Sequence, residues 1–219
     1  MASTWTMITA RALLLDVDGL MVDSEPLWFE VEHDFARSRG GDWTAQHARA
    51  ALGKGQASAL RAMAELGMRV DPSRDLVELE DRFLVRAGEL RVKPGCRELL
   101  AAARGRVPVA AASSSVIRLV SAVLDVLGLA PNFDAVVGGD EVAHPKPAPD
   151  IFLTAAARLG VEPVGCVVLE DSLAGAMAGR AARMEVIAVP EWPTEGLDDV
   201  ATRVVGSLLE ARHILRFER

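Results

Sequence analysis

Two acidic residues follow a short apolar run near the start of the chain. The run Leu13–Leu15 leads directly into Asp16, and Asp18 comes two residues later. Side chains two residues apart in an extended segment point to the same side, so both carboxylates would face one region. Carboxylates placed together can act as nucleophile, as acid or base, or as metal ligands. The pair therefore marks a candidate site.

Polar side chains also follow two later apolar runs. Three serines at 113–115 come after the run at 107–112. The acids Glu170 and Asp171 come after the run at 166–169. If all three runs are parallel strands, these groups converge at the carboxyl edge of one sheet, which is where ligands bind in open parallel sheets.

A single lysine is available to balance these acids. Lys146 stands in the proline-rich loop "HPKPAPD", after the apolar run at 133–137. Four carboxylates in one place are costly unless cations neutralise them, and one lysine is not enough. A divalent cation is implied, and ligands that are all oxygen favour Mg²⁺ over Zn²⁺. Ser113 and the backbone N–H groups beside it could then hold phosphate oxygens.

The elements that would carry these groups alternate between short strands and helices. Short, continuous apolar runs are typical of strands buried on both faces of a parallel sheet, and strand–helix alternation indicates a doubly wound α/β fold. The expected strands are 12–15, 107–112, 133–137, 166–169 and 185–189. The expected helices between them are 115–127, 150–159 and 172–180, and we expect a terminal helix over 208–219.

The segment from about residue 24 to 92 has a different pattern. Apolar residues recur at helical spacing, as at Leu27, Val31 and Phe35, and no strand is predicted. We therefore predict an all-α cap domain over 23–93, inserted into an α/β core domain formed by 1–22 and 94–219. Thr44 is expected to cap the second helix of the insertion.

Composition narrows the class of protein. The chain has 219 residues and a formal net charge of −7, which argues against nucleic-acid binding. No apolar stretch reaches the roughly 18 residues of a membrane span, and no signal-peptide core is apparent. Cys96 and Cys166 are far apart and expected to be unpaired. We expect a cytoplasmic protein that is a monomer or a weak dimer.

Four motifs in order give the chain a family resemblance. They are "DVDGL" at 16–20, Ser113 after a strand, Lys146 in its proline-rich loop, and "EDS" at 170–172. The whole chain resembles the haloacid dehalogenase (HAD) superfamily, in the subgroup of sugar phosphatases and β-phosphoglucomutase that carries a small helical cap.

The resemblance implies a role for each motif residue. Asp16 would attack phosphorus and form an aspartyl-phosphate, and Asp18 would act as acid and base. Asp16, the Asp18 backbone carbonyl and Asp171 would hold Mg²⁺, with Glu170 supporting the ion directly or through water. Ser113 and Lys146 complete the catalytic set. The second aspartate argues against the dehalogenases and phosphonate-cleaving enzymes of the superfamily, which typically lack it.

The expected substrate is a small phosphorylated metabolite, such as a sugar, deoxysugar or polyol phosphate, or phosphoglycolate. The substrate-binding candidates are Ser114, beside Ser113, and cap residues that would contact the leaving group. The cap candidates are Glu25, Trp28, Lys54 and Gln56. Core packing is an equally good interpretation of Trp28, and Lys54 between two glycines is equally well explained as a solvated loop residue.

Two other functions stay open. β-Phosphoglucomutase carries a His where this chain has Trp28, and an Arg where it has Gln56, so the phosphomutase alternative is disfavoured. An inactive module that binds a phosphate ligand or a protein is more remote, because all motif residues are present. His144 and the acids Asp140 and Glu141 are interpreted as solvated surface groups.

Overall fold

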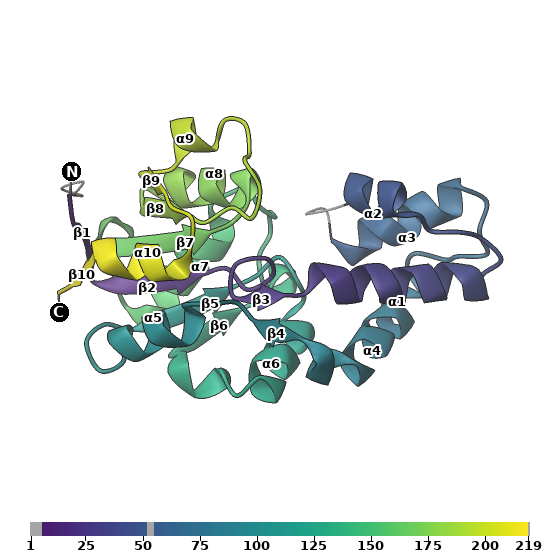
Figure 1. Ribbon diagram of the computed structural model, residues 1–219, viewed down its shortest axis with the longest axis horizontal. Helices are drawn as coiled ribbons and strands as arrows, with labels where there is room; N and C mark the ends of the chain where they lie inside the picture. The colour runs from purple at the N-terminus through teal and green to yellow at the C-terminus, as the bar shows by residue number, and fades with distance from the viewer. Residues whose placement is uncertain (1–5, 52–54, 219) are drawn as a thin grey trace. The chain divides into compact units, whose positions relative to one another are not determined.

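A six-stranded parallel sheet lies at the centre of the α/β part of the molecule (Figure 1). The computed structural model describes residues 6–51 and 55–218. The strand order is β6-β5-β2-β7-β8-β9, so β2, which leads into the first acidic motif, is an inner strand. The strands are β2 (Ala12–Leu15), β5 (Val109–Ala112), β6 (Ala135–Val137), β7 (Cys166–Glu170), β8 (Glu185–Ala188) and β9 (Arg203–Val204). The predicted doubly wound α/β fold is confirmed.

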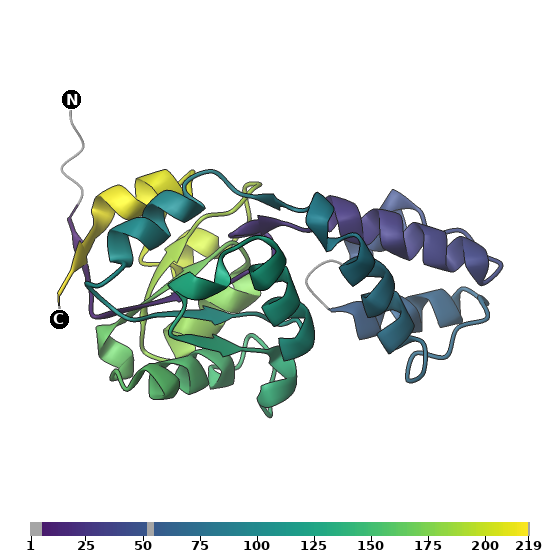
Figure 2. The ribbon, with the colours of Figure 1, turned by 90° about the horizontal axis from the view of Figure 1, so that it is seen from below.

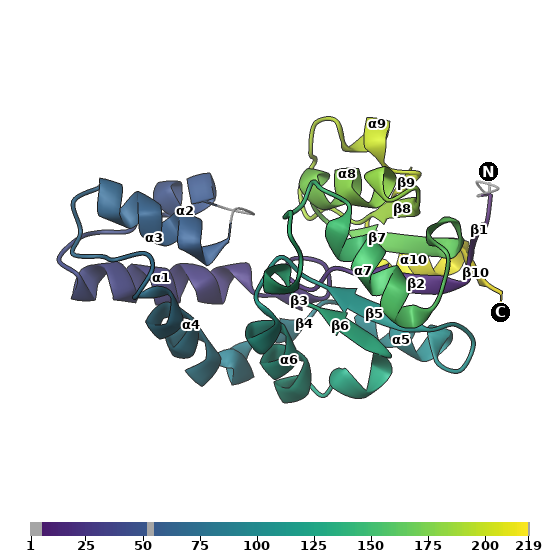
Figure 3. The ribbon, with the colours of Figure 1, turned by 180° about the vertical axis from the view of Figure 1, so that it is seen from behind.

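Helices cover both faces of this sheet. On one face α7 and α8 pack against the strands, and α7 is seen in front of the sheet in Figure 3. On the other face α5 and α10 lie side by side, in front of the sheet in Figure 1. The helices of this part are α5 (Cys96–Ala103), α6 (Ile117–Val126), α7 (Asp150–Leu159), α8 (Leu173–Ala181), α9 (Leu197–Val200) and α10 (Leu208–Ile214). Short 3-10 turns are η2 (Ala130–Asn132), η3 (Gly139–Glu141) and η4 (Pro163–Gly165).

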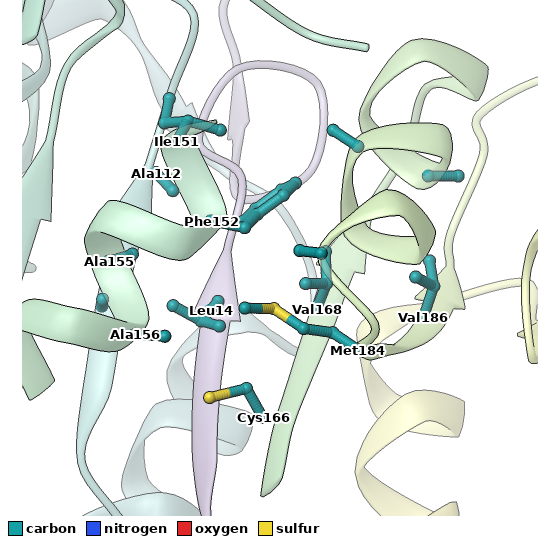
Figure 4. Close-up of a cluster of buried hydrophobic side chains, with 14 of the residues drawn as sticks. Leu14, Ala112, Ile151, Phe152, Ala155, Ala156, Cys166, Val168, Met184 and Val186 are labelled. Atoms are coloured by element: carbon teal, nitrogen blue, oxygen red, sulfur yellow. The ribbon is translucent and has the colours of Figure 1, made fainter. Parts of the chain in front are cut away.

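The core on the α7 and α8 face is filled by small and medium apolar side chains (Figure 4). Leu14 of β2 and Val168 of β7 lie beneath Phe152 of α7, and all three are fully buried. Burial of such side chains contributes roughly 1.5–3 kcal/mol each. This packing fixes the inner strands, and with them the residues at their ends.

The end of the chain differs from its prediction. The expected terminal helix stops at Ile214, and the next residues form strand β10 (Leu215–Phe217). This strand pairs in parallel with β1 (Ile8–Ala10), so the two ends of the described chain run side by side (Figure 2). The prediction of a helix through residue 219 was therefore wrong, because pairing with β1 outweighs the helical pattern of the last residues.

The segment Ser24–Arg91 forms a compact unit of its own, and the chain up to Asp23 together with the chain from Val92 onward forms the other. The helical unit contains α1 (Glu25–Ser38), α2 (Ala45–Ala51), α3 (Gln56–Glu65), α4 (Leu76–Val85) and the 3-10 turn η1 (Ala87–Glu89). The Thr44 hydroxyl accepts a hydrogen bond from the His47 N–H at 3.4 Å, as an N-cap does. Two short strands, β3 (Val22–Asp23) and β4 (Arg91–Val92), pair with each other.

Two tryptophans organise the interior of the helical unit. Trp28 of α1 stacks on Phe83 of α4, with ring centroids 3.8 Å apart. Trp43 is fully buried and its indole N–H donates to the Glu32 carboxylate at 2.8 Å. Buried tryptophans require such a partner for their N–H group, so Glu32 serves as the internal acceptor.

Two further expectations can be compared directly with the structure. Cys96 and Cys166 are buried free thiols, as expected. Within the described ranges, no helix combines the length and the hydropathy needed to cross a bilayer.

Candidate active site

The acidic pair stands where β2 ends. The Asp16 N–H donates to the Leu169 carbonyl of β7 at 3.0 Å, which extends the ladder by one residue and fixes the Asp16 backbone. The Asp16 side chain is almost fully buried. Beyond it the chain turns, and the Gly19 N–H donates to the Val22 carbonyl at 2.9 Å. The turn holds Asp18 close to Asp16 at the carboxyl edge of the sheet.

Lys146 joins the ends of three strands. Its ammonium group donates to Asp16 Oδ1 at 2.5 Å, to Glu170 Oε1 at 2.6 Å and to the Ala112 carbonyl at 3.2 Å. It also lies 5.0 Å from the centroid of the Phe152 ring. Burial alone would lower the pKa of Lys146, but Asp16 and Glu170 raise it above its ordinary value. Lys146 is therefore a permanent cation in this site.

Glu170 is satisfied on both of its carboxylate oxygens. While Oε1 accepts from Lys146, Oε2 accepts from the Asp171 N–H at 3.0 Å and from the Ser172 N–H and hydroxyl, each at 2.9 Å. Burial would raise the pKa of Glu170, but Lys146 and the Ser172 hydrogen bonds lower it below its usual value. A Cβ on Gly175 would lie 1.7 Å from Oε1, so the first turn of α8 leaves room for the carboxylate only because residue 175 is glycine.

Asp171 lies against the turn that follows Asp16. Its Oδ2 lies 2.2 Å from where a Cβ on Gly19 would be, and Gly19 has a φ of +82°. Glycine is thus required at 19 both by the backbone and by this close approach. Burial and the Glu170 charge raise the pKa of Asp171 to about 8. Burial also raises the pKa of Asp16, and the neighbouring carboxylates add to this in spite of Lys146.

The donor set fits a divalent cation. Asp16, Glu170 and Asp171 each offer a carboxylate oxygen, and these oxygens lie within 4.8 Å of one another. Among the described side chains, Lys146 is the basic group in direct contact with this cluster, and it is shared between Asp16 and Glu170. Burial is the main cause of the raised pKa values of Asp16 and Asp171, and the neighbouring carboxylates add to it in spite of Lys146. A bound cation would offset both effects. Hard oxygen donors with excess negative charge suit Mg²⁺.

Two serine hydroxyls hold Asp18. Ser113 Oγ and Ser115 Oγ each donate to Asp18 Oδ2 at 3.0 Å. Ser113 also accepts from the Ser115 N–H at 3.0 Å. Ser115 was not among the predicted site residues, and the signal that pointed to it was the run of three serines after β5. Ser114, the predicted substrate-binding residue of that run, is exposed beside this pair.

The remaining candidates lie in or near other elements. Glu25 and Gln56 are the first residues of α1 and α3, and Trp28 is buried against Phe83. All three belong to the helical unit, and Lys54 lies outside the described residues. His144 is exposed and pairs with Asp150 at 2.9 Å.

The two acids interpreted as solvated surface groups have structural partners. Asp140 Oδ1 accepts from the Ile117 N–H at 2.7 Å, at the start of α6. Glu141 forms an ion pair with Arg158 at 2.8 Å. Both acids therefore stabilise local structure.

A model of the haloacid dehalogenase-like hydrolase family matches residues 10–183. The chain therefore belongs to the haloacid dehalogenase-like hydrolases. It is 34% identical over 199 residues to hexitol phosphatase B of Escherichia coli (strain K12), an alignment covering 82% of this chain and 83% of the relative.

Two other relatives extend this comparison. The chain is 35% identical over 182 residues to the fructose-1-phosphate phosphatase of Escherichia coli (strain K12), covering 81% of this chain and 95% of that protein. A crystal structure from Thermotoga maritima, provisionally described as a β-phosphoglucomutase, superimposes with a TM-score of 0.77 and 30% identity, covering 93% of this chain and 97% of that one.

Proposed function

We propose that the protein is a Mg²⁺-dependent phosphatase that hydrolyses a small phosphorylated sugar, deoxysugar or polyol through an aspartyl-phosphate on Asp16. The observation that carries this proposal is the convergence of Asp16, Asp18, Lys146 and Asp171 at one edge of the sheet. The phosphatase relatives support the reaction, and the substrates in their names, a hexitol phosphate and fructose 1-phosphate, suggest the substrate class.

In the first step, an Asp16 carboxylate oxygen forms a bond to phosphorus while the bond from phosphorus to the ester oxygen breaks. Asp18 donates a proton to that ester oxygen, so that an alcohol leaves. In the second step, water attacks phosphorus, Asp18 takes the proton from the water, and Asp16 is released together with inorganic phosphate. Each aspartate thus returns to its starting state.

The other residues prepare the site for a dianionic substrate. Asp16 and Asp171, with the Asp18 backbone carbonyl, would hold Mg²⁺, and Glu170 supports the set by fixing Lys146. When bound, the ion supplies the positive charge that lets a carboxylate approach a phosphate. Lys146 orients Asp16 and favours its ionised form, and Ser113 donates its hydroxyl to a phosphate oxygen.

The helical unit is proposed to act as the cap that selects the leaving group. Glu25, Lys54 and Gln56 are the candidates for contact with the sugar or polyol, with Ser114 on the α/β side. Trp28 is retained as a candidate, although its stacking on Phe83 favours a role in packing.

A phosphomutase is the second candidate, favoured by the structural relative from Thermotoga maritima. The position that would carry the mutase His holds Trp28, a buried indole with no titratable proton. We therefore propose hydrolysis as the main reaction.

A phosphate-release screen tests the proposal. Hexose, deoxyhexose, polyol and glycolate phosphates are each incubated with the protein and Mg²⁺, with and without EDTA, beside Asp16→Asn. We expect Mg²⁺-dependent release from sugar or polyol phosphates, abolished by EDTA and by the substitution. Absence of release from all of them, or release that survives Asp16→Asn, contradicts the proposal. Conversion of β-glucose 1-phosphate to glucose 6-phosphate faster than phosphate release would favour the mutase.

A further inference from the structure

The proposed function gives no role to Ser115, although its hydroxyl contacts Asp18. Ser115 follows β5 and is half-buried, and its Oγ donates to Asp18 Oδ2 at 3.0 Å across 97 positions of sequence. Ser113 Oγ donates to the same oxygen at 3.0 Å. Two hydroxyls therefore hold one oxygen of the residue proposed as acid and base.

Local structure does not depend on the Ser115 hydroxyl. The backbone N–H of Ser115 donates to Ser113 Oγ at 3.0 Å, and its carbonyl accepts from the Gly139 N–H at 2.8 Å. Both bonds involve backbone atoms of residue 115 and survive removal of its side-chain oxygen. The hydroxyl is thus directed to Asp18 and not to the loop that carries it.

We propose that Ser115 is a positioning residue that keeps Asp18 oriented as the proton donor while Ser113 binds the phosphate. This inference rests on the proposed phosphatase function. A serine hydroxyl has one proton to donate. When Ser113 donates it to a phosphate oxygen, the bond from Ser113 to Asp18 is lost, whereas Ser115 still donates to Oδ2.

The two serine contacts also distinguish the two oxygens of Asp18 from each other. Both hydroxyl contacts are made to one oxygen of Asp18, Oδ2. In the proposed acid role, the proton that Asp18 transfers is therefore carried on the other oxygen, Oδ1. In the first step this proton passes to the ester oxygen as its bond to phosphorus breaks, and Asp18 becomes a carboxylate that Ser115 stabilises.

Two aryl phosphates distinguish a role of Ser115 in proton donation from a general effect on substrate binding or folding. Phenyl phosphate and p-nitrophenyl phosphate have nearly the same shape, but p-nitrophenolate leaves without being protonated, whereas phenolate benefits from an acid. We expect Ser115→Ala to lower kcat/KM for phenyl phosphate about 10–100-fold, part of the roughly 10²–10⁴-fold effect of general acid catalysis. For p-nitrophenyl phosphate the change should stay within about two-fold, since kcat/KM reports the steps up to leaving-group release.

Two control variants make the result decisive. Ser115→Thr keeps the hydroxyl and should restore the activity on phenyl phosphate, while Ser121→Ala, on α6 outside the site, should leave both substrates unchanged. An equal loss on both substrates, or no loss on either, overturns the role of Ser115. Failure of the wild-type protein to hydrolyse either ester in Mg²⁺ would instead refute the proposed function.

Discussion

Lys146 contacts two buried carboxylates, Asp16 and Glu170, and these differ in how fully their hydrogen bonds and charge are satisfied. Glu170 also accepts three hydrogen bonds at the start of α8, so it is fully satisfied without a metal. Asp16 lies in one acidic cluster with Asp171, and burial raises the pKa of both acids. The two residues proposed as metal ligands are therefore the acids whose ionised form the protein alone stabilises least, and Glu170 fixes Lys146 beside Asp16.

Substitution of Gly19 tests the proposed metal site, because an added Cβ would displace a carboxylate oxygen of Asp171. A Cβ at this position would lie 2.2 Å from Asp171 Oδ2, so Gly19→Ala must displace that carboxylate. We expect a loss of about 10–100-fold in activity and in Mg²⁺ affinity, as when the support of a metal ligand is removed. Affinity is measured as the rise of Tm with added Mg²⁺, because a ligand that binds the folded state stabilises it.

Gly67→Ala is the matched control for backbone strain. Gly67 has a φ of +83°, and a Cβ there meets no atom within 4 Å. Both variants therefore bear a similar strain of about 1–2 kcal/mol, but only Gly19→Ala disturbs Asp171. Equal activity and equal Mg²⁺-dependent Tm shifts in the two variants would refute the role given to Asp171.

At the scale of elements, the ends of three inner strands form the site. The runs that form β2, β5 and β7 are continuous and apolar, and the first polar residues after them are the site residues. This pattern was sufficient to predict the parallel sheet and the edge where the motifs meet. It could not predict the Ser115–Asp18 contact, because hydrogen-bond partners 97 positions apart depend on the exact path of two loops.

Other elements left too little signal in the sequence. Strand β9 has two residues, and β10 has three and directly follows α10, so neither shows the alternation that identifies strands. Both are formed by pairing with a neighbour and not by local preference. In the helical unit, apolar spacing indicated the helices, but it did not predict the short strand β4 at the end of the segment, which forms by pairing with β3. The stacking of Trp28 on Phe83 likewise required the packing between α1 and α4.

Glu32 on α1 makes the stability of the helical unit depend on pH. Burial raises its pKa from 4.5 to about 7, although the Trp43 hydrogen bond opposes this. Between these values the folded state binds more protons than the unfolded state, so the free energy of unfolding falls as pH rises. The stabilisation from this group is complete below 4.5 and is lost as pH rises to about 7.

Glu32→Gln should remove this pH dependence. Its amide oxygen can still accept from Trp43, and no charge is buried, so we expect a gain of up to about 3 kcal/mol at pH 8 relative to the wild type. Urea unfolding followed by circular dichroism at pH 5 and pH 8 measures it. Glu65→Gln, an exposed change on α3, should show no such difference. A gain that is equal at both pH values would contradict the assignment to Glu32.

At the scale of the whole molecule, the candidate active site is formed by residues that lie far apart in the sequence. The contacts of Asp18 with Ser113 and of Asp16 with Lys146 span 95 and 130 positions. They exist only when the parallel sheet is complete, so activity should be lost together with the fold in a single transition. Selection of the leaving group is proposed for the helical unit, whose candidate side chains are not part of this sheet.

The most direct test of the account is to find the phosphoryl group on the protein during turnover. Asp18→Asn is mixed with Mg²⁺ and p-nitrophenyl phosphate, quenched in acid within milliseconds to seconds, and mapped by peptide mass spectrometry. This variant should still accept the phosphoryl group, because p-nitrophenolate needs no acid, but it should hydrolyse the acyl phosphate slowly. The account predicts a phosphoryl group on Asp16. Release of p-nitrophenol with no label on the protein, or with the label on another residue, would contradict it.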